Sequence, residues 1–384
     1  MYKMNKIRYF DHAATTAVHE AVLKEMLPYF SIEYGNASSM YSISRSAKKA
    51  LEYARTRVAK AINAENKEIF FTSGGSESDN LAIKGIAYAN KNKGKHIITT
   101  KIEHHAVLET CETLEKEGFE VTYLDVDENG FINLGQLQNA IKDSTILISI
   151  MFANNEIGTI QPIKEIGEIA RERDIIFHTD CVQAMGNVLI NVKDMKIDAL
   201  SMSGHKLYGP KGVGVLYVRD GVEFQKLQNG GHQEKNKRAG TENIAGIVGM
   251  GKAIEIAYLN FEKNTNQMKE LRDYFLKQVE DRIPNIKLNG DREKRLPGNC
   301  NISFENIDGE ELLFKLDEKG ICASAGSACS TGEPEPSHVL TAIGLPAKFL
   351  NGSIRLTFGI DNTREDVDYL IKELDQIVKE LRNK

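Results

Sequence analysis

The chain has 384 residues, a formal net charge of −5 and 41% hydrophobic residues. This length predicts one large domain plus a smaller one with a sizeable core, and it excludes small disulfide scaffolds and disordered tails. No apolar run reaches the roughly 20 residues that a membrane helix needs; the longest, 145–153, is bounded by charged and polar residues. The mild negative charge, without a stripe of Lys and Arg, argues against a nucleic-acid surface.

The first residues lack the apolar core of a signal peptide, so we expect a cytoplasmic protein whose cysteines stay reduced. The five cysteines, at positions 111, 181, 300, 322 and 329, form no Cys-x-x-Cys pair. A structural zinc site is therefore not expected.

From about residue 68, short apolar runs alternate with longer amphipathic stretches. The pattern predicts strands over 68–72, 96–100, 120–126, 145–153, 175–180, 199–203 and 212–219. It predicts helices between them over 77–90, 104–117, 134–142 and 163–173. Strands that alternate with helices indicate an α/β fold, with a mostly parallel sheet covered by helices on both faces.

The second part of the chain has a different pattern. One long helix is predicted around 250–282, in a position that suits a connector between domains. Two apolar runs follow it and predict strands over 300–304 and 353–359. Two amphipathic stretches predict helices over 309–319 and 363–382, so this part reads as a smaller α+β domain. We therefore expect a large domain over 15–258 and a small domain built from 1–14 and 259–384.

Polar groups follow four of the predicted strands, where ligands bind in open α/β sheets. The glycine-rich turn 73–78 opens a helix whose free backbone N–H groups would hold a phosphate. His104, Asp180 and Lys206 follow three other strands. A phosphate cradle, an imidazole, a strand-end carboxylate and a loop lysine together match the needs of pyridoxal phosphate, which forms a Schiff base with Lys and pairs its ring nitrogen with an acidic group. Each residue alone has an ordinary structural explanation, and only the combination is specific.

A series of motifs identifies the chain further by resemblance. It resembles the cysteine desulfurases of the class V aminotransferase group, pyridoxal-phosphate enzymes of fold type I, along almost its whole length. The matching motifs are DHAATT (11–16), GNASS (35–39), FTSGGSESDN (71–80), EHHAV (103–107), NNEIGTIQPI (154–163), FHTDCVQAMG (177–186), SMSGHKLYGPKGVG (201–214), RAGTEN (238–243) and SAGSAC (324–329).

The resemblance implies a role for each matching residue. Lys206 would form the Schiff base and move the substrate Cα proton, and His104 would stack on the ring and assist proton transfer. The remaining cofactor contacts would come from Asp180 at the ring nitrogen, Gln183 at the phenolic oxygen, and Gly75, Ser76, Ser203 and His205 at the phosphate. Thr241 would reach the phosphate from the second subunit of a homodimer. Asn155 and Arg355 would bind the substrate, with the guanidinium on its α-carboxylate.

The resemblance also implies that Cys329 is the nucleophile that accepts the sulfur. Small side chains and two prolines in the surrounding loop, about 323–336, suit a carrier that must approach a buried cofactor and then deliver its persulfide elsewhere. A lone Cys is otherwise most often a small buried hydrophobic residue, the role expected of Cys300 and Cys322. The length of the loop is similar to that of the nitrogen-fixation and iron–sulfur-assembly type, whose loop reaches a scaffold protein.

The chain departs from the family pattern at five positions: His12, Ala37, Tyr41, Ser44 and Cys181. None of them removes a residue assigned above, although His12 and Tyr41 lie in segments that close the active site in the family. Cys181, beside Asp180, could be a second reactive thiol, but packing is its expected role.

We therefore expect a cytoplasmic, homodimeric cysteine desulfurase that converts L-cysteine to L-alanine. Two alternatives remain open among enzymes, a selenocysteine lyase and an aminotransferase of the same fold. A non-catalytic sulfur-relay protein is a third. The sequence leaves the sulfur acceptor open among iron–sulfur assembly, nitrogenase maturation and tRNA thiolation.

Overall fold

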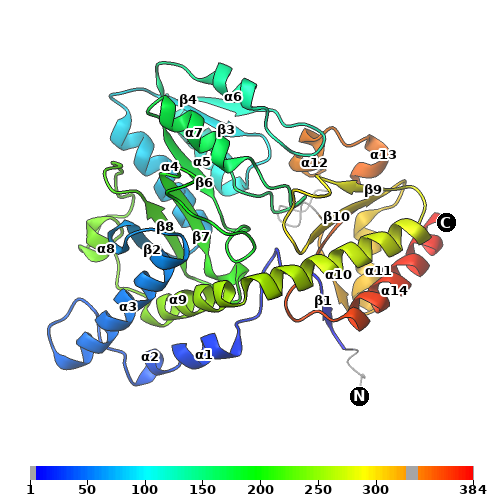
Figure 1. Cartoon of the computed structure of the whole chain (residues 1–384), viewed down its shortest axis with the longest axis horizontal. Helices are drawn as coiled ribbons and strands as arrows, with labels where there is room; N and C mark the ends of the chain where they lie inside the picture. Colours follow the sequence, from blue (N-terminus) through cyan, green and yellow to red (C-terminus); the bar gives the residue numbers. More distant parts are fainter. Residues whose placement is uncertain (1–5, 326–335, 384) are drawn as a thin grey trace.

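The computed structural model describes residues 6–325 and 336–383, and its largest element is a seven-stranded sheet (Figure 1). The strands, in their order across the sheet, are β2 (Ile69–Thr72), β8 (Gly214–Val218), β7 (Ala199–Ser203), β6 (Ile176–Asp180), β5 (Thr145–Ser149), β3 (His96–Thr100) and β4 (Glu120–Leu124). Within this sheet β8 alone runs opposite to the other strands. The predicted mostly parallel sheet is therefore confirmed.

Both faces of the large sheet are buried, as the apolar strands predict. Successive side chains of a strand point to opposite faces, and β8 shows the result: Val215 and Tyr217 join one core, whereas Leu216 and Val218 join another. The first core also contains side chains of α3 (Ser42–Ala61), α7 (Ile163–Glu172) and α9 (Ile244–Leu259). The second contains side chains of α4 (Gly75–Asn90) and α5 (His105–Lys116).

The remaining helices of this part are α1 (Glu20–Met26), α2 (Pro28–Ser31), α6 (Leu134–Ala140) and α8 (Gln233–Asn236). Helices α1, α2 and α3 were not predicted from the sequence. The signal for α3 was nevertheless present, since its buried residues Ala47, Leu51, Ala54 and Val58 recur at helical spacing.

The prediction of one long helix over 250–282 is wrong. Two helices, α9 and α10 (Phe261–Arg282), meet at Asn260 with a bend of 74°. Residues of α9 pack in a core of the large sheet, whereas Leu271 and Phe275 of α10 pack on the small sheet. The bend lets each helix bury its apolar side chains on a different core. Among the described residues no single helix is long and apolar enough to span a membrane; only this bent pair, taken together, has the length and composition.

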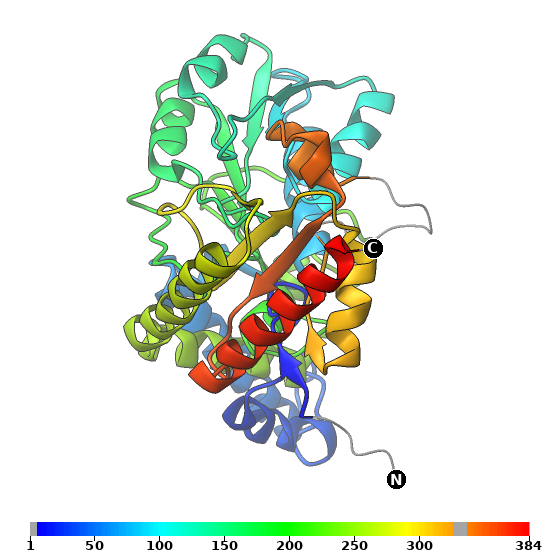
Figure 2. The ribbon, with the colours of Figure 1, turned by 90° about the vertical axis from the view of Figure 1, so that its right-hand side faces the viewer.

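A small antiparallel sheet lies beside α10, with strands β12 (Ser353–Thr357), β10 (Asn299–Phe304) and β9 (Ile286–Asn289). Helices α10, α11 (Gly309–Glu318) and α14 (Arg364–Arg382) share its core, and Figure 2 shows α14 in front of these strands. A two-stranded parallel ladder joins β1 (Arg8–Tyr9) to β11 (Ile321–Cys322). The short helices α12 (His338–Ala342) and α13 (Ala347–Leu350) complete this part, with 3-10 turns η1 (Asn66–Glu68) and η2 (Gly204–Lys206) in the large part.

Residues 11–16 connect the two sheets. The backbone N–H of Thr357 donates to the Phe10 carbonyl at 2.7 Å, and the N–H of Thr16 donates to the His205 carbonyl at 2.9 Å. The segment therefore runs from the edge of the small sheet to the carboxyl end of β7, where the candidate site lies.

Candidate active site

A cavity of about 490 Å³ lies at the carboxyl ends of the large sheet's strands and is closed on one side by the small sheet. Ten of the predicted site residues line it: Gly75, Ser76, His104, Asn155, Asp180, Gln183, Ser203, His205, Lys206 and Arg355. The strands thus bring together residues that lie far apart in the sequence.

Asp180 and His104 stand at the ends of two strands of the large sheet. The Asp180 carboxylate, at the end of β6, is buried and accepts a hydrogen bond from the Val182 backbone N–H at 2.8 Å. Burial raises its pKa, and the charges of His104 and Lys206 oppose this rise. His104 caps α5, because its Nδ1 accepts from the Ala106 N–H at 3.1 Å. Burial lowers the pKa of His104, which favours its neutral form.

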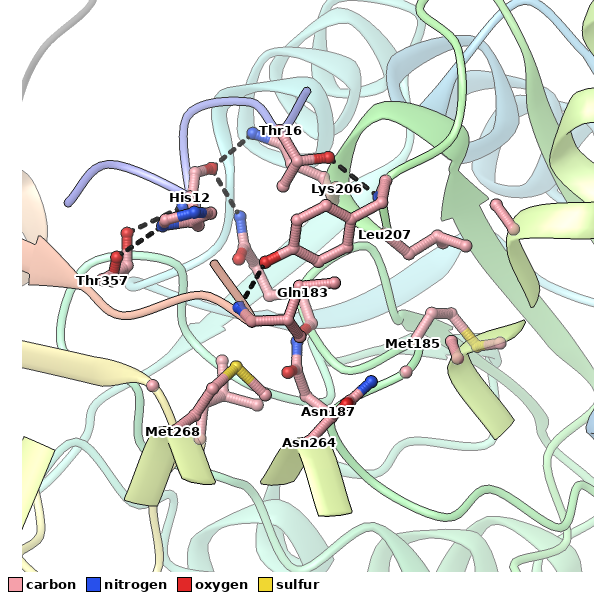
Figure 3. A pocket seen from close by; sticks show the side chains of 18 of the residues that line it. His12, Thr16, Gln183, Met185, Asn187, Lys206, Leu207, Asn264, Met268 and Thr357 are labelled. Atoms are coloured by element: carbon pink, nitrogen blue, oxygen red, sulfur yellow. Dashed lines mark hydrogen bonds between the residues drawn. The ribbon is translucent and has the colours of Figure 1, made fainter. Parts of the chain in front are cut away.

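Lys206 follows β7 in the turn η2, and its ammonium is held by backbone carbonyls. Its Nζ donates to the carbonyls of Ala13 at 2.5 Å and Ala14 at 2.7 Å, and Gln183 Nε2 donates to the Ala13 carbonyl at 3.0 Å. Figure 3 shows Lys206 and Gln183 from a second, smaller cavity of about 70 Å³ that they also line. The DHAATT segment therefore holds both side chains through its backbone.

The glycine-rich turn forms a hollow at the start of α4, next to Ser203 and His205. A Cβ on Gly75 would lie 2.6 Å from Val182 Cγ2, so this position has no room for a side chain. Burial, followed by the charge of Lys206, lowers the pKa of His205 to about 4 and keeps its imidazole neutral at pH 7. Glu77, which was not singled out from the sequence, accepts from the Ser73 N–H at 2.8 Å and pairs with Arg238 at 2.7 Å.

Arg355 lies on β12 and lines the cavity from the side of the small sheet. Its Nη2 donates to Asp11 Oδ1 at 2.9 Å and its Nη1 to the Asn155 carbonyl at 3.2 Å. Within residues 6–325 and 336–383, its buried Nε has no hydrogen-bond partner. Asp11 and Glu156 also line the cavity and were not singled out from the sequence, although they lie in the family motifs DHAATT and NNEIGTIQPI.

One described residue of the predicted site, Thr241, does not line this cavity. Thr241 is exposed, beside a separate hollow that Gly240 and Glu242 line. A single chain does not test its expected contact with the phosphate of a second subunit. Cys329 lies outside the described residues.

The other cysteines behave as packing residues. Cys181 is fully buried, and burial raises the pKa of its thiol far above the ordinary value, so it is not poised as a second reactive thiol. Cys300 is buried in β10, and Cys322 is half-buried in β11.

The residues present fit pyridoxal phosphate. The hollow at the start of α4 offers backbone N–H groups at the positive end of a 16-residue helix, the environment that a phosphate prefers. A buried carboxylate, Asp180, faces the same cavity as the lysine, and these are the acidic group and the amine that this cofactor requires. The unpartnered Nε of Arg355 leaves a donor for the carboxylate of an amino acid.

Comparisons with known proteins agree with this fit. The aminotransferase class-V family model matches residues 8–370. The cysteine desulfurase IscS of Clostridium botulinum (strain Hall) is 59% identical over 381 residues, which cover 99% of this chain and 96% of that protein. The cysteine desulfurase IscS of Methanosarcina thermophila is 56% identical over 379 residues, which cover 99% and 94%.

Solved structures show the same relationship. A NifS-like protein of 37% sequence identity superposes with a TM-score of 0.93, covering 98% of this chain and 100% of its own. Likeness along the whole chain, in sequence and in fold, shows that this protein belongs to the cysteine desulfurases of the class-V aminotransferase family, enzymes that depend on pyridoxal phosphate.

Proposed function

We propose that the chain removes sulfur from L-cysteine, releases L-alanine and keeps the sulfur as a persulfide on Cys329 until an acceptor takes it. The observation that carries this proposal is one cavity lined by Lys206, Asp180 and an Arg355 whose buried Nε has no partner within the described residues. A lysine, a carboxylate and a carboxylate-binding guanidinium suit an amino acid held by its α-carboxylate beside pyridoxal phosphate.

Pyridoxal phosphate, when bound, supplies an aldehyde that condenses with amines and a ring that accepts electrons from the substrate Cα. In the proposal Asp180, His104 and Gln183 hold the ring. Gly75, Ser76, Ser203 and His205 hold the phosphate, together with Thr241 of a second subunit.

The chain's own residues then move protons and sulfur. Arg355 and Asn155 hold the substrate by its carboxylate and orient it. Lys206 Nζ takes the Cα proton as a base, assisted by His104. The Cys329 thiolate attacks the substrate sulfur, and the Cβ–S bond breaks with its electron pair left on the substrate. A proton delivered to Cβ and the return of a proton to Cα then complete L-alanine. The sulfur stays on Cys329 as a persulfide.

Cys329→Ser tests the function, because only sulfur chemistry needs this thiol. A hydroxyl stays protonated where a thiol, with a pKa of about 8.5, forms a thiolate. We expect the cofactor content and its absorbance change with L-cysteine to persist, while alanine release and protein-bound persulfide are lost. Cys322→Ser is the matched control and should keep the parent rate.

Three other results would decide against the proposal. Alanine release at the parent rate in Cys329→Ser would exclude Cys329 as the acceptor. A parent protein that cleaves selenocysteine but releases no alanine from L-cysteine would favour the lyase, because selenium is the better leaving group. A colourless parent protein without turnover would favour the non-catalytic relay.

For the acceptor we propose an iron–sulfur scaffold protein in the cytoplasm, on the basis of the length of the 323–336 segment. Loading Cys329 with ³⁵S from labelled cysteine and adding a scaffold protein should move the label to the scaffold. If the label stays on Cys329 when the scaffold is added, but moves when a tRNA-modifying protein is added instead, the choice of acceptor is wrong.

We also propose a homodimer of two-domain subunits, with a large domain over 15–258 and a small domain over 1–14 and 259–384. The separate cores of the two sheets support the division. The dimer is supported by a set of exposed apolar side chains, here called the N-terminal apolar patch, on α1, α2 and the turn before α3 (Figure 1): Leu23, Leu27, Phe30, Ile32, Tyr34, Met40 and Tyr41. Exposed apolar patches of this kind mark protein interfaces.

A further inference from the structure

The carboxylate of Asp11 contacts two different parts of the active site with its two oxygens. Oδ1 accepts from Arg355 Nη2 at 2.9 Å, and Oδ2 accepts from the Ser324 hydroxyl at 2.6 Å. Both Asp11 and Ser324 are at most 9% exposed and line the main cavity. Hydrogen bonds to an ionised group in such a site are strong and directional.

Backbone contacts hold the three residues together. Ser324 and Arg355 form an antiparallel bridge, in which the Arg355 N–H donates to the Ser324 carbonyl at 2.6 Å and the Ser324 N–H donates to the Arg355 carbonyl at 3.2 Å. Asp11 forms a parallel bridge to Thr357, two residues further along β12. The three side chains therefore meet through backbone pairing, and their contact does not depend on a flexible surface arrangement.

Ser324 lies five positions before Cys329 in the chain, and the chain returns to the same place after that segment. The Ser337 hydroxyl donates to Glu156 Oε2 at 2.5 Å, and Glu156 faces the cavity beside Asn155, whose carbonyl accepts from Arg355. Described residues on either side of the Cys329 segment are thus both tied to carboxylates around Arg355.

We propose that Asp11 is a positioning residue of the active site, which orients Arg355 for the substrate carboxylate with one oxygen and anchors Ser324, at the start of the Cys329 segment, with the other. This inference rests on the proposed function and deepens it. Because Asp11 occupies Nη2, the Nε of Arg355 is left for the substrate. One carboxylate then orients the guanidinium that holds the substrate and fixes Ser324, a described residue five positions before Cys329.

The first test is Asp11→Asn in the holoenzyme, with cofactor content checked by absorbance. Asn keeps the size of the side chain but removes the charge that pairs with Arg355. We expect the dissociation constant of L-alanine, measured by the change in cofactor absorbance, and the KM for L-cysteine both to rise about 10-fold or more. Unchanged values for both would overturn the inference.

Asp366→Asn is the control for a general effect on the small sheet. Asp366 is buried too, but it caps α14 and pairs with Lys6, away from the cavity. L-alanine binding should stay within about twofold of the parent. A rise equal to that of Asp11→Asn would show a merely structural effect and would overturn the inference. Because L-alanine binding needs no desulfuration, this arm remains decisive even if the parent lacks turnover and the proposed function fails.

The second test is Ser324→Ala, which removes only the Ser324 contact and leaves Asp11 on Arg355. We expect L-alanine binding and KM within about twofold of the parent, but a several-fold slower formation of persulfide on Cys329 in a single turnover, followed by mass spectrometry. Ser324→Thr, which retains the hydroxyl, should recover most of the rate. Persulfide formation at the parent rate in Ser324→Ala, or a rise in KM as large as that of Asp11→Asn, would overturn the two-sided role.

Discussion

At the scale of single residues, burial more than charge sets the chemistry around the cavity. Glu103, which directly precedes His104, shows this effect in a carboxyl group near the site. Its Oε1 accepts from the Thr100 hydroxyl at 2.7 Å and the Met151 N–H at 3.0 Å, while Oε2 has no partner among the described residues. Burial raises the pKa of Glu103 to about 8, so the group is protonated in the folded chain at pH 7.

This raised pKa predicts a pH dependence of stability. Between the ordinary value of 4.5 and about 8, folded Glu103 keeps a proton that the unfolded chain has released, so a rise in pH favours unfolding. We expect the free energy of unfolding of the parent to fall, relative to Glu103→Gln, by a few kcal/mol between pH 5 and pH 8. Chemical denaturation at both pH values measures the difference.

The exposed residue Glu112, on α5, provides the control Glu112→Gln, which reports the effect of the same substitution without burial. If the parent and Glu103→Gln lose stability in parallel from pH 5 to pH 8, Glu103 is ionised in the folded state and the assignment is wrong.

At the scale of elements, the start of α4 shows how close packing shapes a binding site. Gly75 begins the helix against Val182, whose backbone N–H bonds Asp180. The predicted phosphate turn and the predicted ring carboxylate, which lie about a hundred positions apart, thus touch through one valine. A substitution at Gly75 should therefore disturb the position of Asp180, and a substitution at Asp180 should disturb the start of α4.

We therefore predict that Gly75→Ala weakens pyridoxal phosphate binding about 10-fold or more, because the added methyl would lie 2.6 Å from Val182 Cγ2. Titration of the cofactor-free protein, followed by absorbance, measures the dissociation constant. Val182→Ala removes the clashing methyl, so the double variant should bind more tightly than Gly75→Ala. A double variant that is no better than the single one would show that the clash is not the cause.

At the scale of the whole molecule, the active site lies between two cores. The large sheet supplies Asp180 and Lys206, the small sheet supplies Arg355, and residues 11–16 bond to both. A ligand held by the large sheet stabilises only the folded state, by an amount that grows with its concentration relative to its dissociation constant.

Removal of the cofactor should therefore lower the Tm by several degrees, as measured by calorimetry with and without added pyridoxal phosphate. In Asp180→Ala the gap between the two melting curves should shrink, because the ring would lose the acidic partner proposed for it. Equal melting temperatures of the parent with and without cofactor would contradict the assigned binding site.

The N-terminal apolar patch leads to a prediction about assembly. Phe30→Asp combined with Ile32→Asp places two charges in the patch and should convert the proposed dimer to a monomer, as light scattering after gel filtration would show. Pyridoxal phosphate should also bind less tightly, since Thr241 of the second subunit would be lost. Phe314→Asp on α11, 66% exposed and outside the patch, is the control. A parent that runs as a monomer with full cofactor occupancy would contradict both the dimer and the role of Thr241.

The sequence by itself determined the class of fold and most of the cavity. Short runs such as HIITT and ALSMS predict strands that are buried on both faces, and the structure buries every residue of both. A ligand in an open α/β sheet binds at the carboxyl ends of such strands. The positions of His104, Asp180 and Lys206 directly after such strands are therefore enough to assign them to one edge of the sheet. The resemblance to the family, and not the strand pattern, pointed to Arg355, which comes from a different sheet.

Only the tertiary structure decided which groups act together through packing. The bend at Asn260 was missed because no Gly or Pro interrupts residues 252–282, although the two halves bury their side chains on different cores. The two contacts of Asp11 were equally hidden, since they join residues 313 and 344 positions apart. Contacts of this range depend on how the N-terminal segment and Ser324 pair with β12, which local periodicity does not encode.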